Sequence, residues 1–201
     1  GEFDWVLCAI TQESEWSASD PGRDVQGFAA VAEKDPALNT RFLEDRASVA
    51  FWRLQEALWN ADAKTLRAVA DDAFCEALEK DAREKPLFYR DAAVGAVIAL
   101  AVEPGQPRDR AHVIVRWSGR RCEGAKEQGS AYVENVLILE RKAGVVTDPK
   151  AGLRSLRCAS CGAPPTGSTR PSARLMAMTP RRKAQASSVE DGVGISMRPA
   201  C

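Results

Sequence analysis

The chain has 201 residues, and its 28 lysines and arginines balance 28 aspartates and glutamates, so its formal net charge is zero. Apolar residues make up 45% and charged residues 28% of the chain, which predicts a globular protein with a hydrophobic core. No run of eighteen apolar residues occurs, which excludes a predicted membrane-spanning helix, and the acidic, Trp-rich first residues predict no signal peptide. Six cysteines without a paired framework predict a reducing compartment.

The first 23 residues predict a lead-in arm that docks on another surface. The arm is rich in apolar side chains but too short for a core of its own. Exposed aromatic side chains in such an arm are typical of a partner surface, so Trp5 and Trp16 are predicted to contact a partner.

Helical periodicity dominates residues 24 to 86. The first helix is predicted at about 24–34, where apolar residues recur on one face. The longest is predicted at 40–60, capped by Asn39 or Thr40. Two shorter helices follow, the first capped by Asp62 and the second by Asp71 or Asp72. Pro86 is predicted to end this helical half.

The pattern then changes to that of strands. Residues 92–102 are small, apolar and β-branched, which predicts a strand buried on both faces. Further strands are predicted at 111–117 and 132–141, with a polar loop at 118–129 between them. Helices followed by an antiparallel sheet predict the α+β class, with the N-terminal helices packed on a curved, cone-shaped sheet. The apolar pocket of this cone is predicted to be lined by Ile98, Leu100, Val113, Val115, Leu137 and Leu139.

The predicted domain ends at residue 157, and a Cys-x-x-Cys motif follows it directly. Cys158 and Cys161, in the segment 158–165, have the spacing of half a zinc knuckle. Tetrahedral zinc needs four ligands, and the remaining cysteines (Cys8, Cys75, Cys122 and Cys201) and the single His112 are isolated. We therefore predict no cofactor, unless another segment or chain completes a zinc site. Residues 166–201 predict a disordered basic tail, whose dispersed charges without aromatics predict no nucleic-acid partner.

Four segments, taken in order, resemble the bacterial Tim-forty-four-like domain, a family named after the peripheral subunit of the mitochondrial inner-membrane import translocase. They are Phe51 to Trp59, Ala61-Asp62 with Thr65-Leu66-Arg67, Glu134 to Arg141, and Cys158 to Pro164. The resemblance covers roughly residues 24–165 and implies a cone of the nuclear-transport-factor-like type with a large apolar pocket. It also implies a place at the periphery of the bacterial inner membrane, on its reducing cytoplasmic side. In relatives a second Cys-x-x-Cys follows the first, whereas Thr166 to Ala200 contains no cysteine.

Three functions follow as hypotheses. The first, which the resemblance favours, is a non-catalytic module that binds a protein segment or a lipid acyl chain, with no small-molecule substrate. The second is an enzyme of the same superfold, in which Tyr132, Glu134 and Asp91 meet in the pocket. The third is a ligand-free structural spacer. The contents of the cone distinguish them: apolar walls indicate binding, a desolvated carboxylate indicates catalysis, and filling by side chains indicates a spacer.

Several side chains have simpler predicted roles. Glu134 is expected to pair across the sheet with Arg116, which is the usual fate of a carboxylate on a strand. His112 is predicted to lie at a solvent edge rather than to act as a base. Trp52 and Trp59, seven residues apart on one helix face, are predicted to belong to the core.

Overall fold

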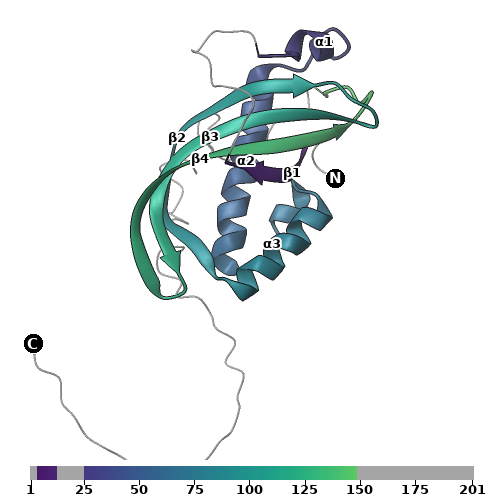
Figure 1. Cartoon of the computed structure of the whole chain (residues 1–201). Helices are drawn as coiled ribbons and strands as arrows, with labels where there is room; N and C mark the ends of the chain where they lie inside the picture. Colours follow the sequence, from purple (N-terminus) through teal and green to yellow (C-terminus); the bar gives the residue numbers. More distant parts are fainter. Residues whose placement is uncertain (1–3, 13–24, 149–201) are drawn as a thin grey trace, which may run out of the picture.

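A curved four-stranded antiparallel sheet with helices packed on its inner face forms the described part of the chain, which is residues 4–12 and 25–148 of this computed structural model (Figure 1). The strand order is β1-β4-β3-β2. The elements in chain order are β1 (Val6–Thr11), α1 (Phe28–Ala32), α2 (Thr40–Asn60), the short 3-10 helix η1 (Leu66–Ala68), α3 (Asp72–Glu84), β2 (Leu87–Glu103), β3 (Arg108–Glu123) and β4 (Lys126–Lys142). The predicted α+β class with helices on a curved antiparallel sheet is confirmed. None of the helices in the described ranges is long and apolar enough to cross a membrane.

Helix α2 is the longest of the described helices, and its predicted bounds of 40–60 are confirmed. The side chain of Asn39 accepts a hydrogen bond from the Phe42 N–H at 2.8 Å, which satisfies one of the free donors of the first turn. Ala61, in the left-handed region at φ 50°, ends the helix. Between these ends, Leu43, Ala47 and Leu54 turn toward the sheet and are buried.

Replacing Asn39 with alanine should lower the free energy of unfolding by about 1 kcal/mol, because the Phe42 N–H loses its side-chain acceptor. Urea unfolding followed by circular dichroism measures this. Asn60→Ala, at the other end of the same helix, is the matched control and should change little. Equal losses in the two variants would contradict a capping role for Asn39.

The first helix is shorter than predicted. Only Phe28–Ala32 is helical, whereas residues 24–34 were expected. Gln26 instead forms a parallel bridge with Ala101 on the edge of β2, where the Val102 N–H donates to the Gln26 carbonyl oxygen at 2.8 Å. Because these backbone groups are already hydrogen-bonded to the sheet, the helix starts only after Gly27, at φ 71°.

The predicted helix after Asp62 is a single 3-10 turn, Leu66–Ala68. The next helix is as expected, because the Asp71 side chain accepts from the Ala73 N–H at 2.9 Å and caps α3. This cap fixes the point at which the chain turns back along the inner layer.

The prediction of a polar loop at 118–129 is wrong, because these residues belong to β3 and β4, which form one long hairpin. Their polar residues alternate onto the outer face, which water reaches, so a strand tolerates them there. The tight turn is at Gly124, whose φ of 58° suits glycine. Strand β2 also differs from the prediction: of the predicted residues 92–102 only 99–102 are buried, whereas 92–98 are half-buried or exposed.

The predicted lead-in arm contains a strand of the sheet. Strand β1 pairs with β4 through Leu7 opposite Leu139 and Ile10 opposite Leu137. The other edge of β1 is hydrogen-bonded too. The Leu7 N–H donates to the Val69 carbonyl and the Leu7 carbonyl accepts from the Asp71 N–H, both at 2.8 Å. Residues 6–11 are therefore part of the domain, which corrects the predicted boundary at residue 24.

Aromatic rings fill the centre of the core between α2 and the sheet. Phe51 has no exposed surface and makes edge-to-face contacts with Trp52 and Trp117, with ring centroids 5.4 and 5.2 Å apart. Trp52 packs against this core as predicted. Trp59 is half-buried and lies edge-on to Phe88, with centroids 4.7 Å apart. The inner face of the sheet is thus covered by tightly packed side chains.

Candidate functional site

The six residues predicted to line one apolar pocket do not line one. Val113, Val115, Leu137 and Leu139 point to the inner face, are at most 1% exposed, and belong to the same cluster as Leu43 and Phe51 of α2. Side chains of α2 therefore occupy the space in which the sequence predicted a cavity. The alternation of the strands indicated these four positions correctly as inward-facing, but it carries no information on how closely the helix approaches.

Ile98 and Leu100 lie on the opposite, outer face of the sheet. There they pack with Ile114 and Val136, and we call these four residues the outer apolar cluster. The sequence missed this because alternation shows that Ile98 and Leu100 share a face but not which face, and the register places Ile98 opposite Ile114, which points away from the inward-facing Val113 and Val115.

A cavity of about 390 Å³ opens at the end of the sheet, and we call it the end cavity. It lies between α1, the turn that joins β2 to β3, and the segment that follows β4. Its walls are largely apolar or small, and Val146 at its rim is 58% exposed. The residues lining it are Ala30, Val31, Lys34, Asp35, Pro104, Gly105, Gln106, Asp109, Arg141, Ala143, Gly144, Val145 and Val146. None of these residues was predicted to belong to a functional site.

The floor of the end cavity is an ion cluster around Arg141, which we call the Arg141 cluster (Asp35, Asp109, Arg141 and Thr147). Arg141 Nη1 donates to Asp35 Oδ2 at 2.5 Å, and Thr147 Oγ1 donates to the same oxygen at 2.6 Å. The Thr147 N–H adds a hydrogen bond to Asp35 at 3.1 Å. Arg141 and Asp35 are both only 2% exposed. Burial alone raises the pKa of Asp35, but the hydrogen bonds from Thr147 and Arg141 outweigh it and hold the pKa below its ordinary value.

Trp5 packs against the guanidinium of the Arg141 cluster. The Arg141 guanidinium lies over the Trp5 ring, 4.6 Å from its centroid, and Trp5 is 1% exposed. The prediction that Trp5 contacts a partner is therefore wrong. The physical reason is that Val6 begins β1, whose pairing with β4 carries the preceding indole beneath the end of that strand.

Asp109 is the member of the cluster with spare hydrogen-bonding capacity. It accepts from Arg141 Nη2 and from the Gly105 N–H, both at 3.3 Å, which is long for such bonds. An ionised carboxylate has about four acceptor sites. The floor of the cavity can therefore accept a hydrogen bond from a bound donor without breaking the Arg141–Asp35 pair.

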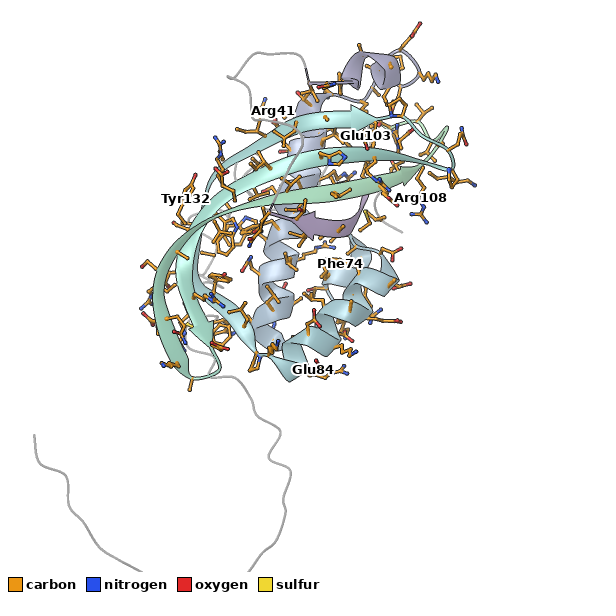
Figure 2. All side chains as sticks on the ribbon, in the orientation of Figure 1. Arg41, Phe74, Glu84, Glu103, Arg108 and Tyr132 are labelled. Atoms are coloured by element: carbon orange, nitrogen blue, oxygen red, sulfur yellow. The ribbon has the colours of Figure 1, made fainter. Side chains whose placement is uncertain are left out.

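The residues of the enzyme hypothesis lie on the outer face. Tyr132 is 69% exposed and projects away from the helices (Figure 2). Glu134 pairs with Arg116 at 2.7 Å, which confirms that predicted pair. Asp91, in the left-handed region at φ 52°, pairs with Arg120 beside a shallow hollow of about 280 Å³. These three residues thus do not meet in a buried pocket, as that hypothesis required.

His112 is not at a solvent edge of the sheet. It lies on β3, between β2 and β4, and its side chain is only 14% exposed. Its Nε2 is 3.2 Å from Glu103 Oε2. Its position in a central strand, rather than at an edge, accounts for the difference from the prediction.

The predicted metal ligands Cys158 and Cys161, together with Cys201, Trp16 and the tail 166–201, lie outside the described residues. Within residues 4–12 and 25–148, no group of three or more His, Cys, Asp or Glu side chains could hold a metal ion. Cys8, Cys75 and Cys122 are free thiols. Burial, with the nearby charge of Glu140, raises the pKa of Cys8 to about 12, so this thiol stays protonated at neutral pH.

Comparison with known proteins adds no relative to this description. No protein-family model, no curated protein and no solved structure matches the chain.

Proposed function

We propose that this chain is a non-catalytic binding module that holds a segment of a partner protein in the end cavity. The observation that carries the proposal is the cavity of about 390 Å³, in which apolar residues such as Val31 and Val146 lie beside polar ones and over a charged floor. Ligand sites are typically cavities of this order, mostly apolar with a few placed polar groups. Attachment to the bacterial inner membrane stays a prediction of the resemblance to the Tim-forty-four-like domain.

The charged floor supports binding rather than turnover. Asp35 accepts hydrogen bonds from both Arg141 and Thr147, and the lowered pKa of Asp35 keeps it ionised and engaged. A general base works best with a pKa near the working pH and a free path to the proton that it removes. Asp109, with its two long hydrogen bonds, is better suited to orient a donor of the partner.

The filled interior supports the ligand-free spacer as a second candidate. Helix α2 occupies the space predicted for an acyl chain or an elongated apolar segment, which weakens the lipid form of the binding hypothesis. The two candidates differ at the end cavity, because a spacer has no use for an open site there.

Filling the end cavity should abolish binding. Peptides from a phage-displayed random library, selected on the full chain, should bind Ala30→Trp at least about tenfold more weakly than the parent, because the indole occupies the cavity. Ala30 is exposed on α1, so the change leaves the core intact. Isothermal titration measures the affinities, and Ala125→Trp, at the tip of the β3–β4 hairpin, is the matched control.

Two results would contradict the binding module. Selected peptides that bind Ala30→Trp as tightly as the parent would place binding elsewhere. A library that yields no peptide with saturable affinity would favour the spacer.

A further inference from the structure

The buried charges of the Arg141 cluster do not balance. Arg141 pairs with Asp35 at 2.5 Å and with Asp109 at 3.3 Å, so one guanidinium serves two carboxylates. All three side chains are at most 11% exposed. Lys34 is the other charged residue of the cavity lining, but it is exposed, and no ion pair among the described residues joins it to either carboxylate. The buried floor of the end cavity therefore carries one formal negative charge in excess.

This excess charge favours a cation as the group that enters the end cavity. A buried carboxylate without a full counterion is costly, because its surroundings stabilise the charge less well than water does. A cation would supply the missing counterion, whereas the excess charge repels an anion. Both terminal nitrogens of Arg141 are already engaged, Nη1 with Asp35 and Thr147 and Nη2 with Asp109. Charge complementarity thus points to a cationic group on the partner.

The acceptor sites of Asp109 decide which cation fits. Its Oδ2 accepts from Arg141 Nη2 and its Oδ1 accepts from the Gly105 N–H, both at 3.3 Å. Each oxygen can accept one more hydrogen bond, but each also holds a donor that hinders the bidentate approach of a second guanidinium. An ammonium group binds as a compact point charge and needs only one of these acceptor sites at a time.

We infer that the end cavity binds a primary ammonium group of the partner segment, with Asp109 as its acceptor, an inference that rests on the proposed function of the cavity. Two sources carry such a group, a lysine side chain and the free amino terminus of a chain. Val31 and Val146 offer apolar surface to the stem of a lysine or to the first residues of a segment, and the charged head then meets the floor.

Acetylation of the partner tests this inference and distinguishes the two sources. Peptides selected on the full chain are synthesised unmodified, with acetylated lysine side chains, and with an acetylated amino terminus. One acetylated form should bind the parent at least about tenfold more weakly than the unmodified peptide, because acetylation removes the charge that Asp109 accepts. Isothermal titration measures the affinities, and the form that loses affinity identifies the source.

Substitution of Asp109 tests the acceptor. Asp109→Asn should bind the unmodified peptide at least about tenfold more weakly, because the amide keeps an oxygen for the Gly105 N–H but loses the charge. The acetylated peptide has already lost this contact, so the same substitution should weaken its binding little further. Glu134→Gln, which removes a carboxylate paired with Arg116 on the outer face, is the control and should bind like the parent.

Three results would overturn the inference. Peptides that bind equally well with both lysines and amino terminus acetylated, yet lose affinity for Ala30→Trp, would refute the ammonium group and leave the binding module intact. Unchanged affinity in Asp109→Asn would refute Asp109 as the acceptor. A library that yields no saturable binder would overturn both this inference and the proposed function. Because the acetylated peptides are compared on the parent chain, the test does not depend on whether Asp109→Asn folds.

Discussion

Phe51→Ala should lower the free energy of unfolding by about 3–5 kcal/mol, one of the two largest effects expected for a single substitution in this chain. Phe51 has no exposed surface and contacts two tryptophan rings, so its removal leaves a cavity that α2 and β3 cannot close. Urea unfolding followed by tryptophan fluorescence and circular dichroism measures the loss. The variant also tests the filled interior, because a ring at the wall of an open pocket would cost much less.

Phe74→Ala is the matched control for this substitution. Phe74 is half-buried on α3 and packs only against the margin of the core. Its loss should therefore be clearly smaller than that of Phe51→Ala. Similar losses in the two variants, both near 1 kcal/mol, would argue that the space under the sheet is loosely packed.

Arg141→Met should also cost about 3–5 kcal/mol, because it leaves the Asp35 carboxylate buried without its cationic partner. Arg110→Met is the control, since Arg110 pairs with Glu140 at 2.8 Å but is half exposed, and such pairs contribute at most about 1 kcal/mol. Adding Asp35→Asn to Arg141→Met should restore part of the stability, because the buried charge is then gone. Equal losses for the two arginine variants would contradict a structural role for the Arg141 cluster.

The pH dependence of this effect has a definite sign. In the parent, the folded-state pKa of Asp35 lies below its unfolded value, so its contribution is present above the unfolded pKa and is lost as pH falls through the folded pKa. In Arg141→Met, burial without the guanidinium should raise the folded pKa of Asp35. The difference in unfolding free energy between parent and variant should then begin to shrink above about pH 4, as pH falls through the raised pKa of Asp35 in the variant, and shrink further below about pH 4, where the parent loses the contribution of its ionised Asp35.

Local signals in the sequence were reliable where the structure is local. The Asn39 and Asp71 caps, the bounds of α2 and the Arg116–Glu134 pair depend on neighbours along a helix or directly across two strands. Periodicity and capping chemistry record such neighbours. The fold class followed from the order of these elements.

The features that the sequence did not predict depend on residues that lie far apart in the sequence. Asp35 meets Arg141 across 106 positions and Thr147 across 112, and no short window of sequence contains both sides of such a contact. Trp5 resembled an exposed aromatic because its cover, Arg141, lies far along the chain. The β3–β4 hairpin resembled a loop because its residues 125–130, around and after the turn, are exposed to solvent.

The position of β1 constrains the order in which this chain acquires its structure during synthesis. Its first residues leave the ribosome early, yet Cys8 donates to the Ile138 carbonyl, a partner 130 positions later. At roughly 5–20 residues per second, that partner is translated about 7–26 s after Cys8. Until then Trp5 and Leu7, both fully buried at the end, have no sheet to join and remain open to chaperones and to other nascent chains. The edge of the sheet that β1 forms therefore cannot close before β4 has been translated.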